Sequence, residues 1–409
     1  MNDDDSRDDE LMLFASIAVI LGAQDEDEDR NGRAQRESEE INLAVRQVAP
    51  FCFGARLRSG AVTDGEVCVH TRCERKEWLD AISAALGMDA HAERFGHVGR
   101  FGQMKLPGAV LVARAMAYLK SPTRMMDLRL AFGVSKGNIV ESINHVINVI
   151  WQRRFELSVT SLLMRRDVLD MCACAMDAKL LPPNVFAAGH SLNYFASLDG
   201  KLFNAVAGWE RLWCSRKKSQ AMNSQFIVTP IGILLFGGCV PGSSPDVEAA
   251  NILPQLGAIK AGLDVQHLSY HIVADCAYAP TEDRMGGFVV VRRTPWVGMS
   301  PAELDSLERF NAVFSSIRTC VEWCFSFLVS SMSQIDYRKK IRPNTNQRPE
   351  RKILAATVLS NCLTCLRGRN QISDYFGVRP PTLEEYLATF NDEAVRFAIA
   401  SYFDRVLNQ

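Results

Sequence analysis

The sequence predicts a mixed α/β protein in which helices cover a central sheet and a further helical region precedes it. Three observations support this class. Hydrophobic residues occupy 47% of the 409 positions, which is enough for a substantial core. Apolar residues recur at helical spacing between residues 106 and 154. From residue 185 onward, short β-rich runs alternate with helical ones, as in a sheet flanked by helices.

Charge divides the chain into an acidic tail and a mildly basic body. Residues 1–40 carry 14 acidic and 4 basic side chains, a net charge of −10, whereas residues 41–409 carry 33 acidic and 42 basic side chains, a net charge of +9. Because residues 25–40 are almost wholly polar, we expect the tail to be disordered. The basic body permits DNA binding without requiring it.

No segment predicts a membrane span or a secretory signal. The apolar run at residues 11–23 is too short to cross a bilayer, and its upstream flank is acidic where a signal peptide needs positive charge. The twelve cysteines are scattered, so we expect most of them to be small core residues in a reducing compartment. We therefore expect a soluble protein.

Three helices are predicted within a helical region that spans residues 41–180. The first follows Pro107, the second follows Ser121-Pro122-Thr123, and the third follows a Gly133-Val134 turn with Ser135 as its N-cap. A glycine turn before the last of three short helices is typical of a helix-turn-helix at about residues 106–154. Any helical bundle gives the same pattern, so DNA binding is one of two interpretations.

Two basic or polar segments are candidate DNA contacts. Ser135, Lys136 and Asn138 lie at the start of the third helix, where a helix-turn-helix reaches bases or phosphates. Arg216, Lys217 and Lys218 lead into a predicted hairpin, where they would neutralise phosphates and make binding sensitive to salt. Charge clusters are more often solvated surface, and that alternative stays open.

The sheet is predicted in a domain that covers residues 185–390. Two β-rich runs at residues 223–228 and 233–239 form a hairpin, and a strand at residues 194–199 precedes them. The elements expected after the hairpin are a helix at residues 246–256, strands at residues 269–274 and 287–291, and a helix at residues 304–329.

Carboxylates follow two of these apolar strands. Asp199 ends the first strand and Asp275 follows the strand at residues 269–274, so they are expected to converge at the sheet. Converging carboxylates repel one another unless a cation lies between them, and Mg²⁺ or Mn²⁺ prefers such oxygen ligands. Two ions about 4 Å apart can activate an attacking oxygen and stabilise the leaving oxygen of a phosphodiester.

Glu322 on the late helix would complete this cage. The alternative is that these acids are local structural residues. An Asp before Gly is most often a turn residue, and Asp246 would serve as a helix N-cap.

Six short motifs in order resemble Harbinger-type transposases of the DDE endonuclease superfamily. They are SLDG at residues 197–200, PGSSPD at 241–246, ADCAY at 274–278, RTCVEWCF at 318–325, NCLTCL at 361–366 and PPTLEEYL at 380–387. The resemblance implies a ribonuclease-H-like nuclease fold with a helical C-terminal extension. It implies catalytic roles for Asp199, Asp275 and Glu322, with Asp246 as a fourth metal-site candidate.

The resemblance also implies a reaction and partners. The chain would use divalent metal, in the form of two ions, to cut DNA phosphodiester bonds, with strand transfer as a further step. It would act in the nucleus, or in the nucleus and the cytoplasm, as a homo-oligomer with a Myb-like DNA-binding partner protein.

Departures from the family pattern leave a second function open. Lys201 and Leu202 follow the first motif where the family often has Thr and His, Pro245 precedes Asp246, and Ser326 follows Phe325. These changes keep every carboxylate but alter their neighbours. A domesticated DNA-binding or scaffold protein without cutting activity is therefore the alternative to the enzyme. The recognised DNA sequence and the role of residues 41–105 are not indicated by any motif.

Overall fold

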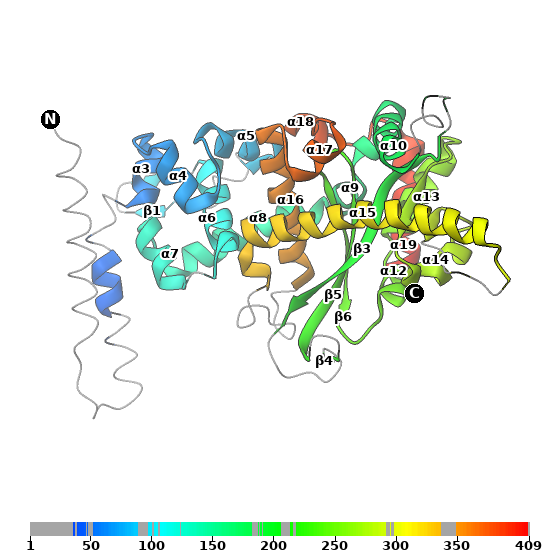
Figure 1. The fold of residues 1–409 in the computed structure, drawn as a ribbon. Coiled ribbons are helices and arrows are strands. Elements are labelled where there is room, and N and C mark those ends of the chain that lie inside the picture. Colours follow the sequence, from blue (N-terminus) through cyan, green and yellow to red (C-terminus); the bar gives the residue numbers. More distant parts are fainter. Residues whose placement is uncertain are drawn as a thin grey trace.

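The computed structural model describes residues 36, 39–45, 47, 52–88, 97–99, 102–104, 107–122, 124–181, 187, 189, 191–205, 213–215, 218–291, 295, 298–336 and 349–407. Within these residues the protein is a curled mixed sheet surrounded by helices, with a group of helices at its N-terminal end (Figure 1). The expected mixed α/β class is therefore confirmed. The predicted disorder of the tail concerns mostly residues outside the described part.

The N-terminal helices include the three that the sequence predicts. They are α6 (Gly108–Lys120), α7 (Met125–Phe132) and α8 (Lys136–Gln152). Gly133 ends α7 in the left-handed conformation with φ of 64°, and the Ser135 side chain caps α8 by accepting from the Asn138 N–H at 3.3 Å. Before them come α3 (Phe53–Ser59), α4 (Asp64–Thr71), α5 (Glu77–Ala85) and the hairpin of β1 (His97–Gly99) and β2 (Gly102–Met104).

The sheet has β3 at its centre. The strands are β3 (Tyr194–Asn204), β4 (Trp213–Cys214), β5 (Ser219–Val228), β6 (Leu234–Pro241), β7 (His271–Ala274) and β8 (Val289–Val291), in the order β4-β5-β3-β7-β8 with β6 also paired to β5. β3 pairs antiparallel with β5 and parallel with β7, and β7 pairs parallel with β8. The long β5–β6 hairpin is the one that the sequence predicts.

Two sequence-based boundaries are wrong. β3 continues to Asn204 instead of ending at Asp199, because β5 continues as its antiparallel partner through Phe226 to Ala221. The helix expected at residues 246–256 is two helices, α12 (Asp246–Ile252) and α13 (Gln255–Val265). Pro254 explains the break, since a proline lacks an N–H and disfavours helical backbone at the preceding Leu253.

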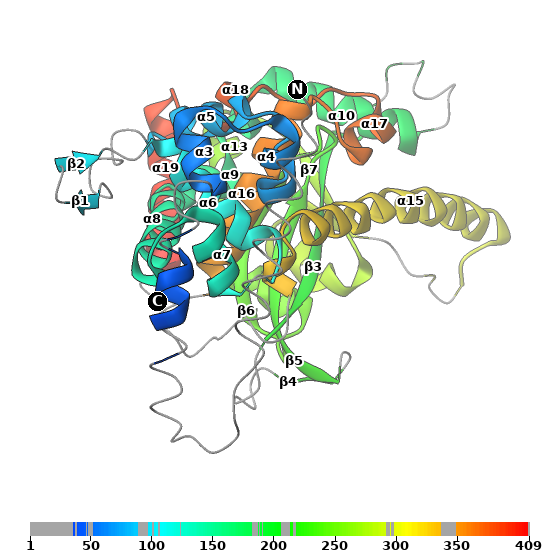
Figure 2. The same ribbon diagram turned by 90° about the vertical axis from the view of Figure 1, so that its left-hand side faces the viewer.

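Helix α15 (Pro301–Ser331) lies across the sheet, and its N-terminal part extends beyond it (Figures 1 and 2). The Phe325 ring packs edge-on against Phe226 of β5, with ring centroids 5.3 Å apart. This contact fixes the crossing point of helix and sheet. The expected long helix is confirmed, with two or three additional residues at each end.

The remaining helices cover the sheet and its ends. They are α9 (Arg154–Val159), η2 (Ser161–Met164), α10 (Arg166–Leu180), η4 (Cys276–Tyr278), α14 (Ala279–Arg284), η5 (Ser333–Asp336), α16 (Pro349–Arg367), α17 (Gln371–Phe376), α18 (Leu383–Leu387) and α19 (Glu393–Leu407). Most of the twelve cysteines are buried and all are free thiols, as expected for core residues. Among the described helices, none combines the length and the apolar character that a membrane span needs.

Candidate metal and DNA site

Two of the predicted acids lie side by side on neighbouring strands. In the parallel pair of β3 and β7, Leu198 is opposite Ala274, so Asp199 and Asp275 each follow a paired residue. Both side chains are half-buried. Asp275 leaves β7 and caps η4, because its Oδ1 accepts from the Cys276 N–H at 2.8 Å. Although β3 does not end at Asp199, the two aspartates follow paired positions on neighbouring parallel strands.

Asp246 reaches the same region from the other side of β3. It is the first residue of α12, and its Oδ1 accepts a hydrogen bond from Asn223 Nδ2 at 2.9 Å. A Cβ atom built on Gly200 would collide with Asp246 Oδ1 and lie 2.8 Å from Gln225 Nε2. Only glycine therefore allows the Asp246 carboxylate to lie directly against the backbone that follows Asp199.

A buried tyrosine lies within the electrostatic influence of the three carboxylates. Tyr278 is fully buried on η4, and its pKa is raised well above the usual range. Burial is the largest cause, followed by the negative charges of Asp246 and Asp199, with a smaller effect from Asp275. The phenol therefore stays protonated and acts as a hydrogen-bond donor at any physiological pH.

A chain of hydrogen bonds with fixed direction runs from this phenol to Asp246. Tyr278 Oη donates to Gln225 Oε1 at 2.8 Å, which leaves the Gln225 amide nitrogen to donate to Asn223 Oδ1 at 3.2 Å. Asn223 Nδ2 then donates both to Asp246 Oδ1 and to the Ser244 carbonyl. Since Asn223 and Gln225 are each 2% exposed, they cannot exchange these partners for water without unfolding the strand.

Glu322, the third predicted catalytic acid, lies on a different element, the helix α15. It is exposed on α15, three residues before Phe325, whose ring lies 5.9 Å from Lys201 Nζ. The structure thus places Asp199 and Asp275 on or next to neighbouring strands, Asp246 at the start of α12, and Glu322 on the helix that crosses the sheet.

The donor chemistry of the group fits a hard cation. All three side chains offer carboxylate oxygens, the ligands that Mg²⁺ and Mn²⁺ prefer, and Gly200 leaves room for the close approach of Asp246. Among the described residues, no three His, Cys, Asp or Glu side chains are placed closely enough to enclose a metal ion. The three aspartates therefore fit a hard cation by the type of their ligand atoms and by their positions in the same region of the sheet, without forming a closed set of ligands.

A groove of about 500 Å³ leads to Asp246. Its lining combines Asn223 and the segment Gly242–Val247 with Leu202, Trp213, Cys214, Ser215 and Ala277. The Trp213 side chain is 51% exposed on the short strand β4. Lys218 is exposed in the turn between β4 and β5, with φ of 50°, whereas Arg216 and Lys217 lie outside the described residues. The groove thus joins the exposed Trp213 side chain to the Asp246 carboxylate.

The structure restricts what the predicted helix α8 residues can contact. Ser135 and Lys136 are exposed at its start, but Asn138 is half-buried and its Oδ1 accepts from Arg114 Nη1 at 2.7 Å. Only the amide nitrogen of Asn138 is left for another partner. The exposed face of α8 continues through residues that our sequence reasoning did not include, namely Glu141, Asn144 and Asn148, which line a shallow surface hollow. Their i, i+3, i+7 spacing was the available signal.

Other residues missed by sequence reasoning are Asn223, Gln225 and Tyr278. Asn223 and Gln225 alternate along a strand that is otherwise almost entirely apolar from residue 221 to 228. Two amides on one face of a buried strand need polar partners, which was a usable signal. Tyr278 lay within the ADCAY motif but carried no assigned role.

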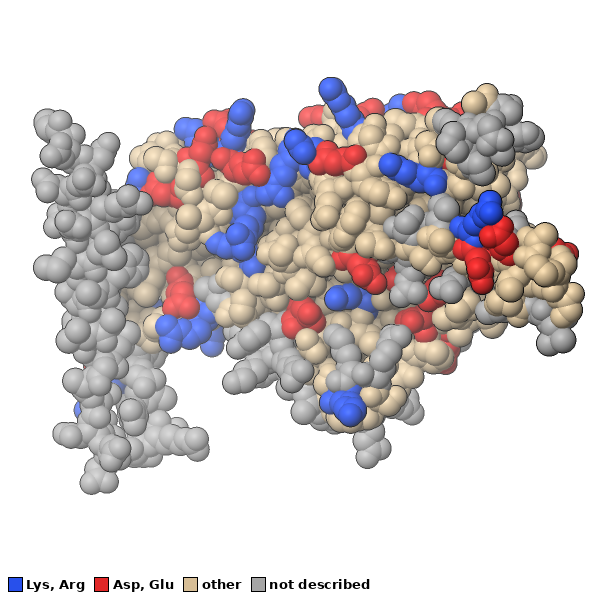
Figure 3. Space-filling view, in the orientation of Figure 1, with Lys and Arg blue, Asp and Glu red and all other residues tan. Residues whose placement is uncertain are grey.

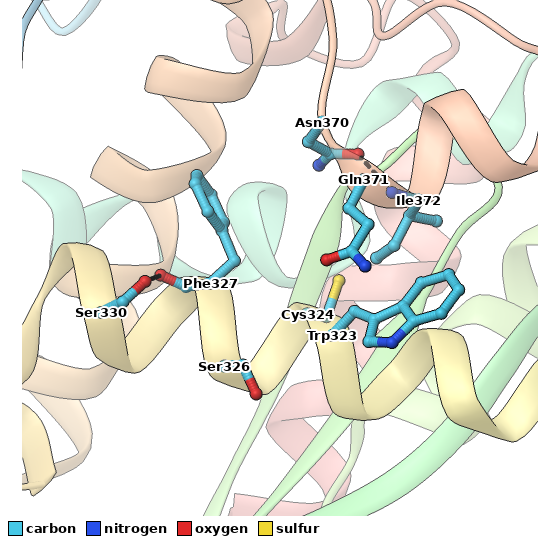
Figure 4. Close-up of a pocket in the computed structure, with 8 residues that line it drawn as sticks. All are labelled: Trp323, Cys324, Ser326, Phe327, Ser330, Asn370, Gln371 and Ile372. Carbon is cyan, nitrogen blue, oxygen red and sulfur yellow. Dashed lines mark hydrogen bonds between the residues drawn. The ribbon is translucent and has the colours of Figure 1, made fainter.

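A second cavity, of about 310 Å³, lies between α15 and the start of α17. Figure 4 shows Trp323, Phe327 and Ser330 of α15 on one side of it and Asn370, Gln371 and Ile372 on the other. Asn370 Oδ1 caps α17 by accepting from the Ile372 N–H at 3.1 Å. All the lining side chains are uncharged, so this cavity is distinct in character from the carboxylate site.

Comparison with known proteins supports a nuclease superfamily for the central part of the chain. Residues 205–361 match a family described as DDE superfamily endonuclease. The matched segment contains Asp246, Asp275 and Glu322, and Asp199 lies just before it. No curated protein and no solved structure matches the chain significantly.

Proposed function

We propose that the protein is a metal-dependent DNA endonuclease or transposase of Harbinger type, with a ribonuclease-H-like catalytic domain. The observation that carries the proposal is the placement of Asp199 and Asp275 on or next to neighbouring parallel strands, with Asp246 held by Asn223 against Gly200. It is supported by the superfamily match at residues 205–361. The substrate class is DNA, and the bond cut is a phosphodiester.

The carboxylates are proposed to hold one or two Mg²⁺ or Mn²⁺ ions. Asp199, Asp275 and Glu322 are the proposed catalytic ligands, and Asp246 is a further metal ligand. When bound, the ions would supply activation of the attacking oxygen and stabilisation of the leaving oxygen. The chain itself holds Asp246 in place through Asn223, and Gly200 admits its carboxylate beside Asp199.

The proposed DNA contacts lie at two places. Ser135, Lys136 and Asn138 begin the third helix of the helix-turn-helix, and Asn138 would use its amide nitrogen. Arg216, Lys217 and Lys218 belong to the segment of the sequence that precedes β5. Nuclear location, oligomerisation and a Myb-like partner protein are proposed from the resemblance to Harbinger-type transposases.

The test is nicking of supercoiled DNA in the presence of Mn²⁺. We expect the wild-type chain to nick, and we expect Asp199→Asn and Asp275→Asn to lower the rate by more than about a hundredfold. Asp264→Asn is the matched control, because Asp264 is an exposed aspartate paired only with Lys260 on α13. Glu322→Gln and Asp246→Asn, measured in parallel, show which of the two completes the site.

A metal-induced rise in melting temperature separates enzyme from scaffold. Mn²⁺ at about 100 times its Kd should stabilise the wild type by about 2.7 kcal/mol, and the effect should shrink in Asp199→Asn. If the wild type neither nicks DNA nor gains stability with Mn²⁺ but still binds DNA, the enzyme proposal fails. The domesticated DNA-binding or scaffold protein would then be the better description.

A further inference from the structure

Three helices end at one place on the surface, and each ends on a cation. Arg72 caps α4, Lys120 is the last residue of α6, and Arg367 is the last residue of α16. Arg367 Nη2 donates to the Arg72 carbonyl at 3.4 Å. Figure 3 shows a stripe of Lys and Arg side chains next to the N-terminal helices, with Asp and Glu side chains on either side of it.

The three positive charges exceed the nearby negative charge. Arg367 pairs with Glu74 at 2.7 Å, but in the described part of the chain neither Arg72 nor Lys120 makes an ion pair. Burial and the neighbouring Arg72 both lower the pKa of Lys120, and burial and Lys120 likewise lower the pKa of His70. The group is thus an uncompensated positive region, in which Arg72 is exposed and Lys120 and Arg367 are half-buried.

Helix ends alone do not explain this arrangement. A cation at a helix C-terminus interacts favourably with the helix dipole, and this effect accounts for each residue taken singly. It does not account for three helices that bring their cations together, because like charges at short range repel one another. Such a cluster is stabilised by an external anion, and a polyanion that spans several cations gains most by releasing its counterions.

We propose that Arg72, Lys120 and Arg367, here called the seam patch, bind the phosphate backbone of DNA. The patch joins the N-terminal helices to the sheet domain, since α4 and α6 belong to the first and α16 to the second. This inference rests on the proposed DNA substrate and deepens it by locating a contact that no sequence motif assigns.

The seam patch lies beside α15, the helix that carries Glu322. The Arg367 guanidinium lies over the Phe327 ring at 5.8 Å, and Phe327 lines the cavity of Figure 4 together with Trp323. Both aromatic residues are on α15, which also carries Glu322, and Phe327 is about 8 Å along the helix axis from it. A DNA strand on the patch would therefore lie beside the helix that carries the proposed third carboxylate.

The test is DNA affinity of the full chain as a function of salt, measured by fluorescence anisotropy in EDTA so that cutting plays no part. Lys120→Gln and Arg72→Asn each remove one charge, and Asn tolerates the left-handed backbone at residue 72, where φ is 71°. Arg309→Gln is the matched control, because Arg309 is an exposed arginine on α15 paired with Asp305.

We expect each patch variant to weaken binding several-fold and to lower the slope of log affinity against log salt by about 1, and the double variant by about 2. The control should leave the slope unchanged. If the patch variants and the control bind DNA alike, or if the patch variants lose only melting temperature, the three cations stabilise helix C-termini and the inference is wrong. A wild type that binds no DNA at low salt also overturns it.

The outcomes separate this inference from the proposed function. If the chain binds DNA through the seam patch but does not nick it, the inference about the patch is supported and the proposed nuclease function fails. If the chain nicks DNA but the patch variants bind DNA as the control does, the proposed nuclease function is supported and the inference about the patch fails.

Discussion

At the scale of single residues, the position of the Asp246 carboxylate depends on the side-chain amides of Asn223 and Gln225. Asn223 is the only described side chain between the Gln225 amide and the Asp246 carboxylate, and it donates to Asp246 Oδ1 at 2.9 Å. Tyr278 keeps its proton and donates to Gln225 Oε1, which orients the Gln225 amide and the bonds that follow it. Side chains that orient a metal ligand in this way tune its affinity for the ion.

We predict that Asn223→Leu weakens Mn²⁺ binding by about 10- to 100-fold, because the substitution removes the donor that holds Asp246. The measurement is a Mn²⁺ titration, with the melting temperature in EDTA recorded for each variant. Asn251→Leu is the control, since Asn251 is a half-buried asparagine of α12 whose side chain accepts from Thr281 instead of contacting a carboxylate. Equal losses in both variants would show that the effect is general destabilisation.

At the scale of elements, the Asn361 side chain makes two hydrogen bonds that a neighbouring strand would otherwise make with the edge of β6. Among the described strands, β6 pairs with β5 alone, so its other edge needs partners. Asn361 of α16 is 1% exposed, and its Oδ1 accepts from the Leu234 N–H at 3.1 Å while its Nδ2 donates to the Leu234 carbonyl at 2.7 Å. The amide thus makes both bonds that a neighbouring strand would make, and it docks α16 on the sheet.

We predict that Asn361→Leu lowers the free energy of unfolding by about 2–5 kcal/mol, because two buried backbone groups lose their partners. Chemical denaturation monitored by circular dichroism measures this change. Ser360→Ala is the matched control on the same helix, since Ser360 Oγ is buried with no hydrogen-bond partner among the described residues. It should be close to neutral, and a loss as large as that of Asn361→Leu would contradict the edge-strand explanation.

At the scale of the whole molecule, charge is unevenly distributed along the chain. Residues 1–35 carry 11 acidic and 3 basic side chains, so they lower the net charge of the chain by 8. The rest is basic, and the seam patch lies within it. An acidic segment joined to a basic DNA-binding body competes with DNA for the same positive surface.

We predict that removal of residues 1–35 raises DNA affinity by about tenfold at low salt, and that the gain falls as salt approaches about 200 mM. Anisotropy with the same duplex measures this effect. A variant that keeps the length but replaces the eleven acids with serine separates charge from bulk. If that variant binds like the wild type, charge competition is not the cause.

Much of the fold follows from local sequence. The helices α6, α7 and α8 and the β5–β6 hairpin lie where apolar spacing and turn residues place them, because such signals act over neighbouring residues. The strand carboxylates Asp199 and Asp275 were also located, since an acid after an apolar strand is visible in one segment. The resemblance added Asp246 and Glu322 as candidates and placed the chain in a superfamily that the match at residues 205–361 supports.

Only the tertiary structure decided which of these groups meet. The length of β3 depends on its partner β5. The surroundings of Asp246 depend on Gly200 and on Asn223 and Gln225, two polar side chains at strand positions where the sequence pattern predicts apolar core residues. The seam patch draws on residues 72, 120 and 367, which lie far apart in sequence. Local propensity determines the helices and strands, whereas long-range packing determines which charges share a surface. That packing depends on contacts between distant segments, so no single segment of the sequence predicts it.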